Sequence, residues 1–219
     1  LPIVADAAAA IGATYKGRPL AQIGADLAVV SFNGNKLVTA GGGGAIVSVQ
    51  EALGPPLKHL TSTARVGAVY DHDVVGFNYR MTNLQAAVGV AQLECLGTFL
   101  AAKARIATTY ADAFADLSGV SAFPKVEDTQ GSHWLSGIYV ADAELAEMTR
   151  LRERLTQAGI EGRTFWKPIH LQKPYLDSPH FLHGRSDQVW ERVQPLPCST
   201  QLSAGDQSKV IEVVQSVFG

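Results

Sequence analysis

The stretch Ser31-Phe32-Asn33-Gly34-Asn35-Lys36, continued to a run of four glycines (SFNGNKLVTAGGGG, residues 31–44), decides the fold. It overlaps a short apolar run rich in β-branched residues (LAVVSF, residues 27–32), which is typical of a strand covered on both faces. Lys36 therefore follows the carboxyl end of a buried strand, where α/β sheets place their ligand crevice. A partly desolvated amine there can attack a carbonyl and form a Schiff base. The alternative is a solvated loop lysine.

Two more polar residues are candidates for the same crevice. Asp6 ends a second apolar run (PIVAD, residues 2–6), and parallel pairing of the two strands would bring it to the same sheet edge. A carboxylate there can keep a pyridinium nitrogen protonated, as pyridoxal phosphate requires. Its alternative role is to cap the Ala-rich segment that follows. Ser31 can hydrogen-bond a phosphate oxygen, and the glycines let the backbone approach a ligand closely.

Composition excludes several classes of protein. The 219 residues are enough for one ordinary domain or two small ones, and 47% hydrophobic with 17% charged residues is a globular mixture. Lys and Arg number 18 against 20 Asp and Glu, so the basic excess of a nucleic-acid binder is absent. Two cysteines do not make a disulfide scaffold, and no apolar run spans a bilayer. A cytoplasmic protein without a membrane or nucleic-acid partner is the expectation.

Periodicity and capping residues predict the remaining elements. Residues 45–49 form a third strand, and residues 50–75 form short helical turns and loops. Thr82 and Gln85 make a capping box that begins a long helix, interrupted at Gly97. A compact α+β unit follows, with a strand at 133–140, a helix through 145–155 and a last helix capped at Ser203.

Three ordered runs carry a family resemblance. VADAAAAIGATYKGR (4–18), SFNGNKLVTAGGGG (31–44) and VVGFNYRMTNLQAAVGVAQLE (74–94) resemble the DegT/DnrJ/EryC1/StrS family of pyridoxal-phosphate-dependent sugar aminotransferases. The resemblance continues in FWKPIHLQKPY (165–175) and LPCSTQLS (196–203), so it covers nearly the whole chain. It implies the α/β fold of fold-type I pyridoxal-phosphate-dependent transferases. Residues 1–92 would be the C-terminal part of the large α/β domain, and residues 93–219 a small C-terminal α+β domain with its linking helix.

The resemblance also implies an N-terminal segment that this sequence does not show. Family members carry there a Gly-Thr phosphate loop and an aromatic residue that stacks on the pyridoxal ring. The chain opens at Leu1 without an initiator Met and runs directly into a strand, as a chain would that starts in the middle of a domain. Both observations lead us to expect that a front segment is missing.

By position, the resemblance assigns roles on the cofactor to three residues. It implies that Lys36 forms the Schiff base with pyridoxal 5′-phosphate, that Asp6 pairs with the pyridine nitrogen, and that Ser31 binds the phosphate. Two positions depart from the family pattern. Ala9 stands where Gln, Glu or His often contacts the cofactor ring, and Ala5 stands where an acidic residue is common. Alanine makes no such hydrogen bond, so these losses affect cofactor tuning but leave the covalent anchor.

Three further positions relate to the substrate and to assembly. Asn78 matches the asparagine that reaches the phosphate from the neighbouring subunit, which implies a homodimer with shared active sites. Arg80 lies in the same loop and would shape that shared site, with a structural salt bridge as its alternative. His170 matches a position on the sugar-nucleotide side of the cleft, where a hydrogen-bonded structural histidine would look the same.

The implied activity is transamination, with an amino group passed from glutamate to a nucleotide-linked keto sugar in amino-sugar or surface-polysaccharide biosynthesis. A related sugar dehydratase is disfavoured, because those family members have histidine where this chain has Lys36. An aminotransferase acting on a cyclitol or another ketone stays open. So does a non-catalytic remnant of the family, which Ala5 and Ala9 favour and the set of Lys36, Asp6 and Ser31 opposes.

Other chemistry-bearing residues form no site in the sequence. Three consecutive residues such as 71–73 (DHD) do not converge on one ion in an extended chain. His180 and His183 lack a third ligand nearby, and no metal site is expected. Cys198 has no clear base partner, so a buried or loop thiol is the better interpretation.

Overall fold

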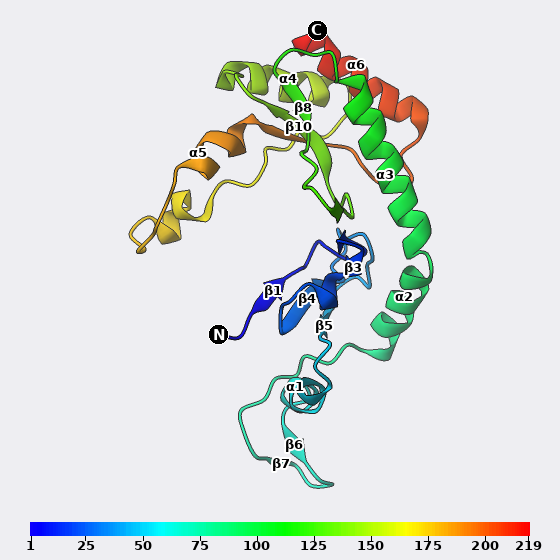
Figure 1. Cartoon of the computed structure of the whole chain (residues 1–219), viewed down its shortest axis with the longest axis vertical. Coiled ribbons are helices and arrows are strands. Elements are labelled where there is room, and N and C mark those ends of the chain that lie inside the picture. The colour runs from blue at the N-terminus through cyan, green and yellow to red at the C-terminus, as the bar shows by residue number, and fades with distance from the viewer. The chain divides into compact units, whose positions relative to one another are not determined.

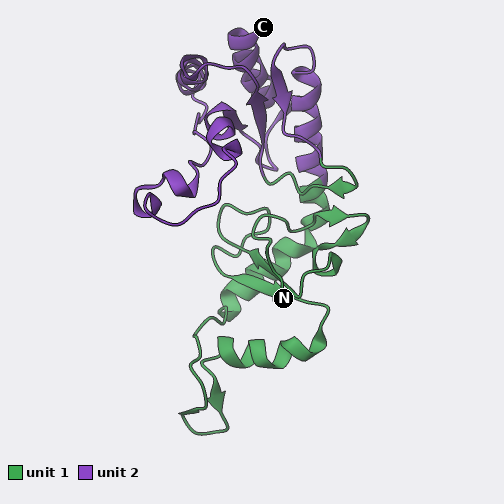
Figure 2. Cartoon of the chain, turned by 60° about the vertical axis from the view of Figure 1, so that its left-hand side comes forward, with its two compact units in different colours: residues 1–100, 126–134 green, residues 101–125, 135–219 purple.

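The computed structural model describes residues 1–219 and divides them into two compact units (Figure 2). Unit 1 comprises residues 1–100 and 126–134, and unit 2 comprises residues 101–125 and 135–219. The expected boundary at 92/93 differs from this division in two ways. Unit 1 extends beyond residue 92 to residue 100. It also includes residues 126–134, which the expected boundary assigns to the second domain.

The sheet of unit 1 orders its strands β1 (Val4–Asp6), β4 (Leu27–Ser31) and β5 (Gly44–Val47) (Figure 1). β1 and β4 run parallel, with Asp6 opposite Val29. β5 pairs antiparallel with the other side of β4, and Ser31 lies opposite Gly44. The parallel pairing on which the position of Asp6 depends is therefore present.

Burial on this sheet differs from the prediction. In β4, Ala28 and Val30 are buried with Val38 in the core, but Val29 is 39% exposed, and its neighbour Ile46 in β5 is 42% exposed. Alternate residues of a strand point to opposite faces. The prediction that these strands are covered on both faces was therefore wrong for residues 1–219, in which one face packs into a core and the other is partly open.

Residues 50–75 form the short helical elements that were predicted and also a strand pair that was not. They comprise a 3-10 helix at Glu51–Leu53, α1 (Gly54–Thr61), and a hairpin of β6 (Arg65–Val66) and β7 (Asp71–His72). Two prolines at 55 and 56 suit the first turn of α1, because the N–H groups there have no helical partner. The loop after β7 leads to the long helices.

The long helical region is two helices, α2 (Asn83–Glu94) and α3 (Leu96–Ala113). The capping box is confirmed, since Thr82 Oγ1 accepts from the Gln85 N–H and the Gln85 side chain accepts from the Thr82 N–H. The break lies at Cys95 and not at Gly97, because the Cys95 N–H bonds to the carbonyls of Gln92 and Leu93 and closes a tight turn. No single helix is long and apolar enough to cross a membrane; α2 and α3 reach that length and apolarity only together, across a 59° bend.

Unit 2 contains both helices and strands. Its antiparallel sheet orders β11 (Val193–Leu196), β10 (Ser136–Val140) and β8 (Val120–Ala122). Its helices are α4 (Leu145–Gln157), α5 (Arg185–Val189), α6 (Ala204–Phe218) and the later part of α3, with 3-10 turns at Ile169–Leu171, Lys173–Tyr175 and Trp190–Arg192. Ser203 caps α6 as predicted, accepting from the Asp206 N–H at 3.0 Å.

Segment 126–134 is joined to unit 1 by a second small sheet. β9 (Thr129–Gln130) pairs with β2 (Thr14–Tyr15), which also pairs with β3 (Arg18–Pro19); a 3-10 helix at Leu20–Gln22 follows. The Lys16 N–H donates to the carbonyl of Asp128 at 2.8 Å. Buried Ser132 donates to the carbonyl of Ala9 at 3.0 Å. These bonds fix the segment beside the turn that follows β1.

Candidate active site

Asp6 and Ser31 end neighbouring parallel strands at one edge of the sheet. The register places Asp6 opposite Val29, so Ser31 lies two residues further along β4 at the same carboxyl-end edge. The loop from Ser31 to Gly44 then begins, and Lys36 lies within it. This edge is where ligands bind in α/β sheets, because side chains and backbone N–H groups leave the strands there.

The Asp6 carboxylate is exposed, and one of its two oxygens accepts a hydrogen bond within the chain. Its Oδ1 accepts from the Ala8 N–H at 3.0 Å, which resembles the capping role weighed for it, but residues 7–13 form turns and no helix. Its Oδ2 accepts no hydrogen bond within the chain. One oxygen of the carboxylate therefore stays available to a ligand at the sheet edge.

The loop that carries Lys36 is closed by its own hydrogen bonds. The Ser31 hydroxyl accepts from the Asn33 N–H at 3.2 Å, and the Lys36 N–H donates to the Asn33 carbonyl at 3.0 Å. The Thr39 hydroxyl donates to the Phe32 carbonyl at 3.3 Å. These bonds hold the loop in a defined shape without using the Lys36 amine.

The Lys36 amine lies on an aromatic ring. Its Nζ is 3.8 Å from the centroid of the Trp134 indole, and the indole N–H donates to the Asn35 carbonyl at 2.7 Å. The two partners of this hydrogen bond are 99 residues apart in the chain, yet both belong to unit 1. Trp134 was not among the residues predicted from the sequence. Neither periodicity nor spacing indicates a contact that depends on the return of segment 126–134.

The polar side chains at this edge fit pyridoxal phosphate by their chemistry. Lys36 supplies a primary amine for the aldehyde, Asp6 a carboxylate oxygen for the pyridine N–H, and Ser31 a hydroxyl for the phosphate. Ala5 and Ala9, the two positions that depart from the family pattern, make contacts within unit 1. Ala5 packs against the core of unit 1, and the carbonyl of Ala9 accepts from Ser132.

Asn78 and Arg80 lie in the loop between β7 and α2. Both are exposed, and Asn78 forms an isolated bridge with Ser62. In the same loop the rings of Phe77 and Tyr79 stack on each other, with their centroids 5.1 Å apart. Arg80 makes no salt bridge, and no hydrogen bond joins either residue to Asp6 or Lys36. A role for this loop at another subunit stays a prediction.

His170 lies in unit 2. Its Nε2 is 2.5 Å from Oδ1 of Asp187, and its side chain is 16% exposed. This is the hydrogen bond expected of a structural histidine, and the substrate role of His170 stays a prediction.

The residues that were not expected to form a metal site or a nucleophile make other contacts in the structure. His59 binds Asp73 at 2.7 Å and lowers the pKa of that carboxyl, and His72 binds the carbonyl of Thr63 at 2.7 Å. Cys198 is buried, with its sulfur 3.3 Å from the amine of Lys103. No three His, Cys, Asp or Glu side chains converge as a metal site would require.

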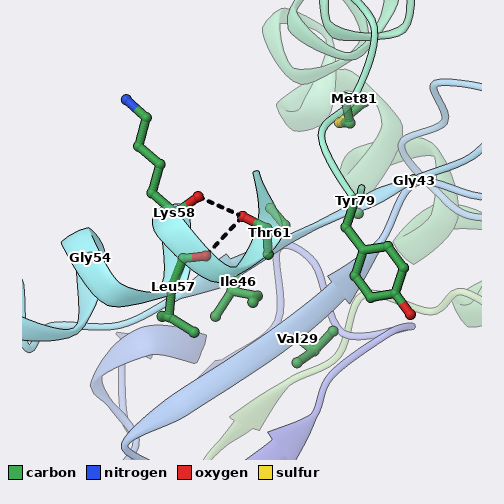
Figure 3. A pocket seen from close by; sticks show the side chains of 11 residues that line it. Val29, Gly43, Ile46, Gly54, Leu57, Lys58, Thr61, Tyr79 and Met81 are labelled. Atoms are coloured by element: carbon green, nitrogen blue, oxygen red, sulfur yellow. Dashed lines mark hydrogen bonds between the residues drawn. The ribbon is translucent and has the colours of Figure 1, made fainter. Parts of the chain in front are cut away.

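A cavity of about 740 Å³ lies on the partly open face of the sheet (Figure 3). The Thr61 hydroxyl on its wall is engaged by the carbonyls of Leu57, at 2.8 Å, and Lys58. Its lining comes from the sheet, α1 and the residues before α2, and includes Val29, Ile46, Leu57, Lys58, Thr61, Tyr79 and Met81. The lining contains none of Asp6, Ser31 and Lys36, so this cavity is not the candidate cofactor site.

Comparisons with known proteins show the family to which the chain belongs. Residues 1–215 match the model of the DegT/DnrJ/EryC1/StrS aminotransferase family. The chain is 35% identical over 223 residues to EpsN of Bacillus subtilis strain 168, covering 100% of this chain and 57% of EpsN. It is 33% identical over 216 residues to the GDP-perosamine synthase of Escherichia coli O157:H7, covering 98% of this chain and 57% of the synthase.

A solved structure shows the same fold. The sugar aminotransferase CalS13 from Micromonospora echinospora matches with a TM-score of 0.86 and 26% identity, over 98% of this chain and 58% of CalS13. The chain thus spans a little more than half the length of the relatives it matches. Both the resemblance and the mixed α/β fold are confirmed. The chain belongs to the DegT/DnrJ/EryC1/StrS aminotransferase family.

Proposed function

We propose that this protein is a pyridoxal-phosphate-dependent aminotransferase that transfers an amino group from glutamate to a keto sugar carried on a nucleotide. The observation that carries the proposal is Lys36 in the loop after β4, with Asp6 at the end of the parallel neighbour β1. Its relatives include a GDP-perosamine synthase and a sugar aminotransferase, which support a nucleotide-linked sugar as the acceptor.

Each polar residue of the edge has a distinct task. When bound, pyridoxal phosphate supplies an aldehyde and a ring that withdraws electrons from the reacting carbon. The Asp6 carboxylate would keep a proton on the pyridine nitrogen, which would strengthen that withdrawal. The Ser31 hydroxyl, which accepts from the Asn33 N–H, would donate its own proton to the phosphate. The Lys36 amine would anchor the cofactor and, once free, would accept a proton from the substrate carbon and deliver it to C4′ of the cofactor.

Two predicted features extend the proposal to the whole enzyme. Asn78, with Arg80 beside it, would complete the phosphate site of a partner subunit in a homodimer. His170 would contact the sugar nucleotide. The exposure of the loop that holds Asn78 is compatible with the first of these roles.

The covalent assignment is tested by reduction. The full-length protein is incubated with pyridoxal phosphate, reduced with borohydride and digested, and the modified peptide is identified by mass spectrometry. We expect the adduct on Lys36, no adduct in Lys36→Ala, and an undiminished adduct in Lys58→Ala, because Lys58 is an exposed lysine of unit 1 outside the sheet edge. An adduct on another lysine, or none, would overturn the assignment.

A further inference from the structure

The contact between Lys36 and Trp134 differs from the other cation–π contacts of the chain. The amine of Lys16 lies 5.3 Å from the ring of adjacent Tyr15, and Arg65 lies 4.9 Å from the ring of exposed Tyr70. The Lys36 amine is closer, at 3.8 Å, and both Lys36 and Trp134 are half-buried. Tryptophan is the aromatic side chain that attracts cations most strongly, and partial burial strengthens the attraction.

The segment that carries the Trp134 ring is held by hydrogen bonds to two parts of unit 1, the loop that carries Lys36 and the turn after Asp6. The indole N–H donates to the Asn35 carbonyl, so the ring is tied to the loop that carries the lysine. Two residues earlier, Ser132 donates to the Ala9 carbonyl in the turn after Asp6. The pairing of β9 with β2 anchors the same segment. Trp134 is therefore held by both parts of the sheet edge that bear the candidate cofactor residues.

The ring also binds the amine without using a carboxylate. Lys36 forms no salt bridge, and Asp6 directs its Oδ1 to the Ala8 N–H. An ion pair between Lys36 and Asp6 would occupy the carboxylate that the pyridine nitrogen needs. An indole face attracts the ammonium and leaves Asp6 free.

We propose that Trp134 is a positioning residue for Lys36, whose ring face holds the ammonium in a defined place whenever the amine is not covalently engaged. The proposal rests on the proposed function for its role in the reaction, in which the free amine must stay near the carbon that exchanges protons. Loss of the ring would leave Lys36 with alternative rotamers pointing to solvent. The amine would then be less protected from reagents and less often in place.

The test measures the amine itself, without cofactor. The cofactor-free, full-length protein is labelled with a limiting amount of acetic anhydride at fixed pH, and the acetylation of Lys36 relative to Lys58 is quantified by mass spectrometry. Trp134→Leu should raise relative Lys36 labelling by about five- to thirtyfold, the factor for about 1–2 kcal/mol of lost cation–π stabilisation. Trp134→Phe keeps a ring face and should restore most of the protection.

Tyr70→Leu is the matched control, because it removes an exposed cation–π contact elsewhere in unit 1 and should leave Lys36 labelling unchanged. Unchanged labelling in Trp134→Leu would overturn the proposal. Equal increases in Trp134→Leu and Trp134→Phe would also overturn it, because the ring face would then be irrelevant.

A second measurement does not depend on folding of a variant. In the native protein, the ε-methylene group of Lys36 is bonded to the Nζ that lies 3.8 Å from the indole centroid, so its protons should show an upfield ring-current shift in the NMR spectrum. A shift at the free-lysine value would contradict the contact. These outcomes are separate from the reduction experiment, whose failure removes the cofactor role of Lys36 whatever Trp134 does.

Discussion

At Gly44 the backbone of β5 approaches β4 so closely that no side chain fits between them. A Cβ built there would overlap the carbonyl oxygen of Val30. The glycine run predicts that the backbone can approach a ligand closely, and in the structure Gly44 also lets two strands approach each other closely. Only the pairing register of β4 and β5 shows this contact. The sequence of four consecutive glycines therefore could not tell which glycine lies against the neighbouring strand.

The Gly44→Ala substitution is therefore expected to destabilise unit 1. Forcing a methyl group against a backbone carbonyl costs about 1–3 kcal/mol of the free energy of unfolding. Gly54→Ala is the control, because a Cβ at Gly54 meets nothing within 4 Å and the residue is helical. Urea denaturation should show a clear loss for Gly44→Ala and no loss for Gly54→Ala. Equal stabilities would contradict the close approach.

The candidate cofactor residues differ in how far the sequence could predict them. Asp6 and Ser31 end apolar runs, and strand ends can be placed from local pattern alone. The placement of Trp134 on Lys36 depends on the pairing of β2 with β9, two strands of two residues each. Strands so short leave no periodic signal, which is why the contact is seen only in the structure.

Among the secondary-structure elements, helices with local caps were predicted well. Thr82 and Ser203 each bond to an N–H three residues ahead, so their signals lie within one turn of sequence. The exposed face of β4 was predicted wrongly. Its burial depends on what packs on the sheet from elsewhere, and the apolar run of residues 27–32 carries no information about that.

The capping box of α2 gives a prediction for this element. Thr82→Ala removes the acceptor of the Gln85 N–H, and we expect the free energy of unfolding to fall by about 1 kcal/mol. Thr82→Ser keeps a hydroxyl and should lose little. Chemical denaturation followed by circular dichroism measures both variants. A Thr82→Ser variant as unstable as Thr82→Ala would show that the methyl group, and not the cap, matters.

At the scale of the whole molecule, a functional site can be predicted from sequence most completely when all of its residues belong to one unit. Asp6, Ser31 and Lys36 belong to unit 1: Asp6 and Ser31 end neighbouring strands at one sheet edge, and Lys36 lies in the loop that follows Ser31. Asn78 also belongs to unit 1, but its proposed role is in another subunit, and His170 belongs to unit 2. Roles that depend on assembly cannot be read from one chain, so they need an experiment on mixed subunits.

Mixing inactive variants tests the shared site directly. If Lys36 of one subunit works with Asn78 of its partner, a hybrid of Lys36→Ala and Asn78→Ala chains contains one intact site and one site with both defects. Equal mixing in a twofold dimer should restore about a quarter of native transaminase activity, because half of the dimers are hybrids. A mixture of Lys36→Ala with Asp6→Ala is the control, since Lys36 and Asp6 lie on the same sheet edge of one chain and no hybrid site is intact. If both mixtures stay equally inactive, Asn78 does not complete a partner's site, and the homodimer with shared sites must be abandoned.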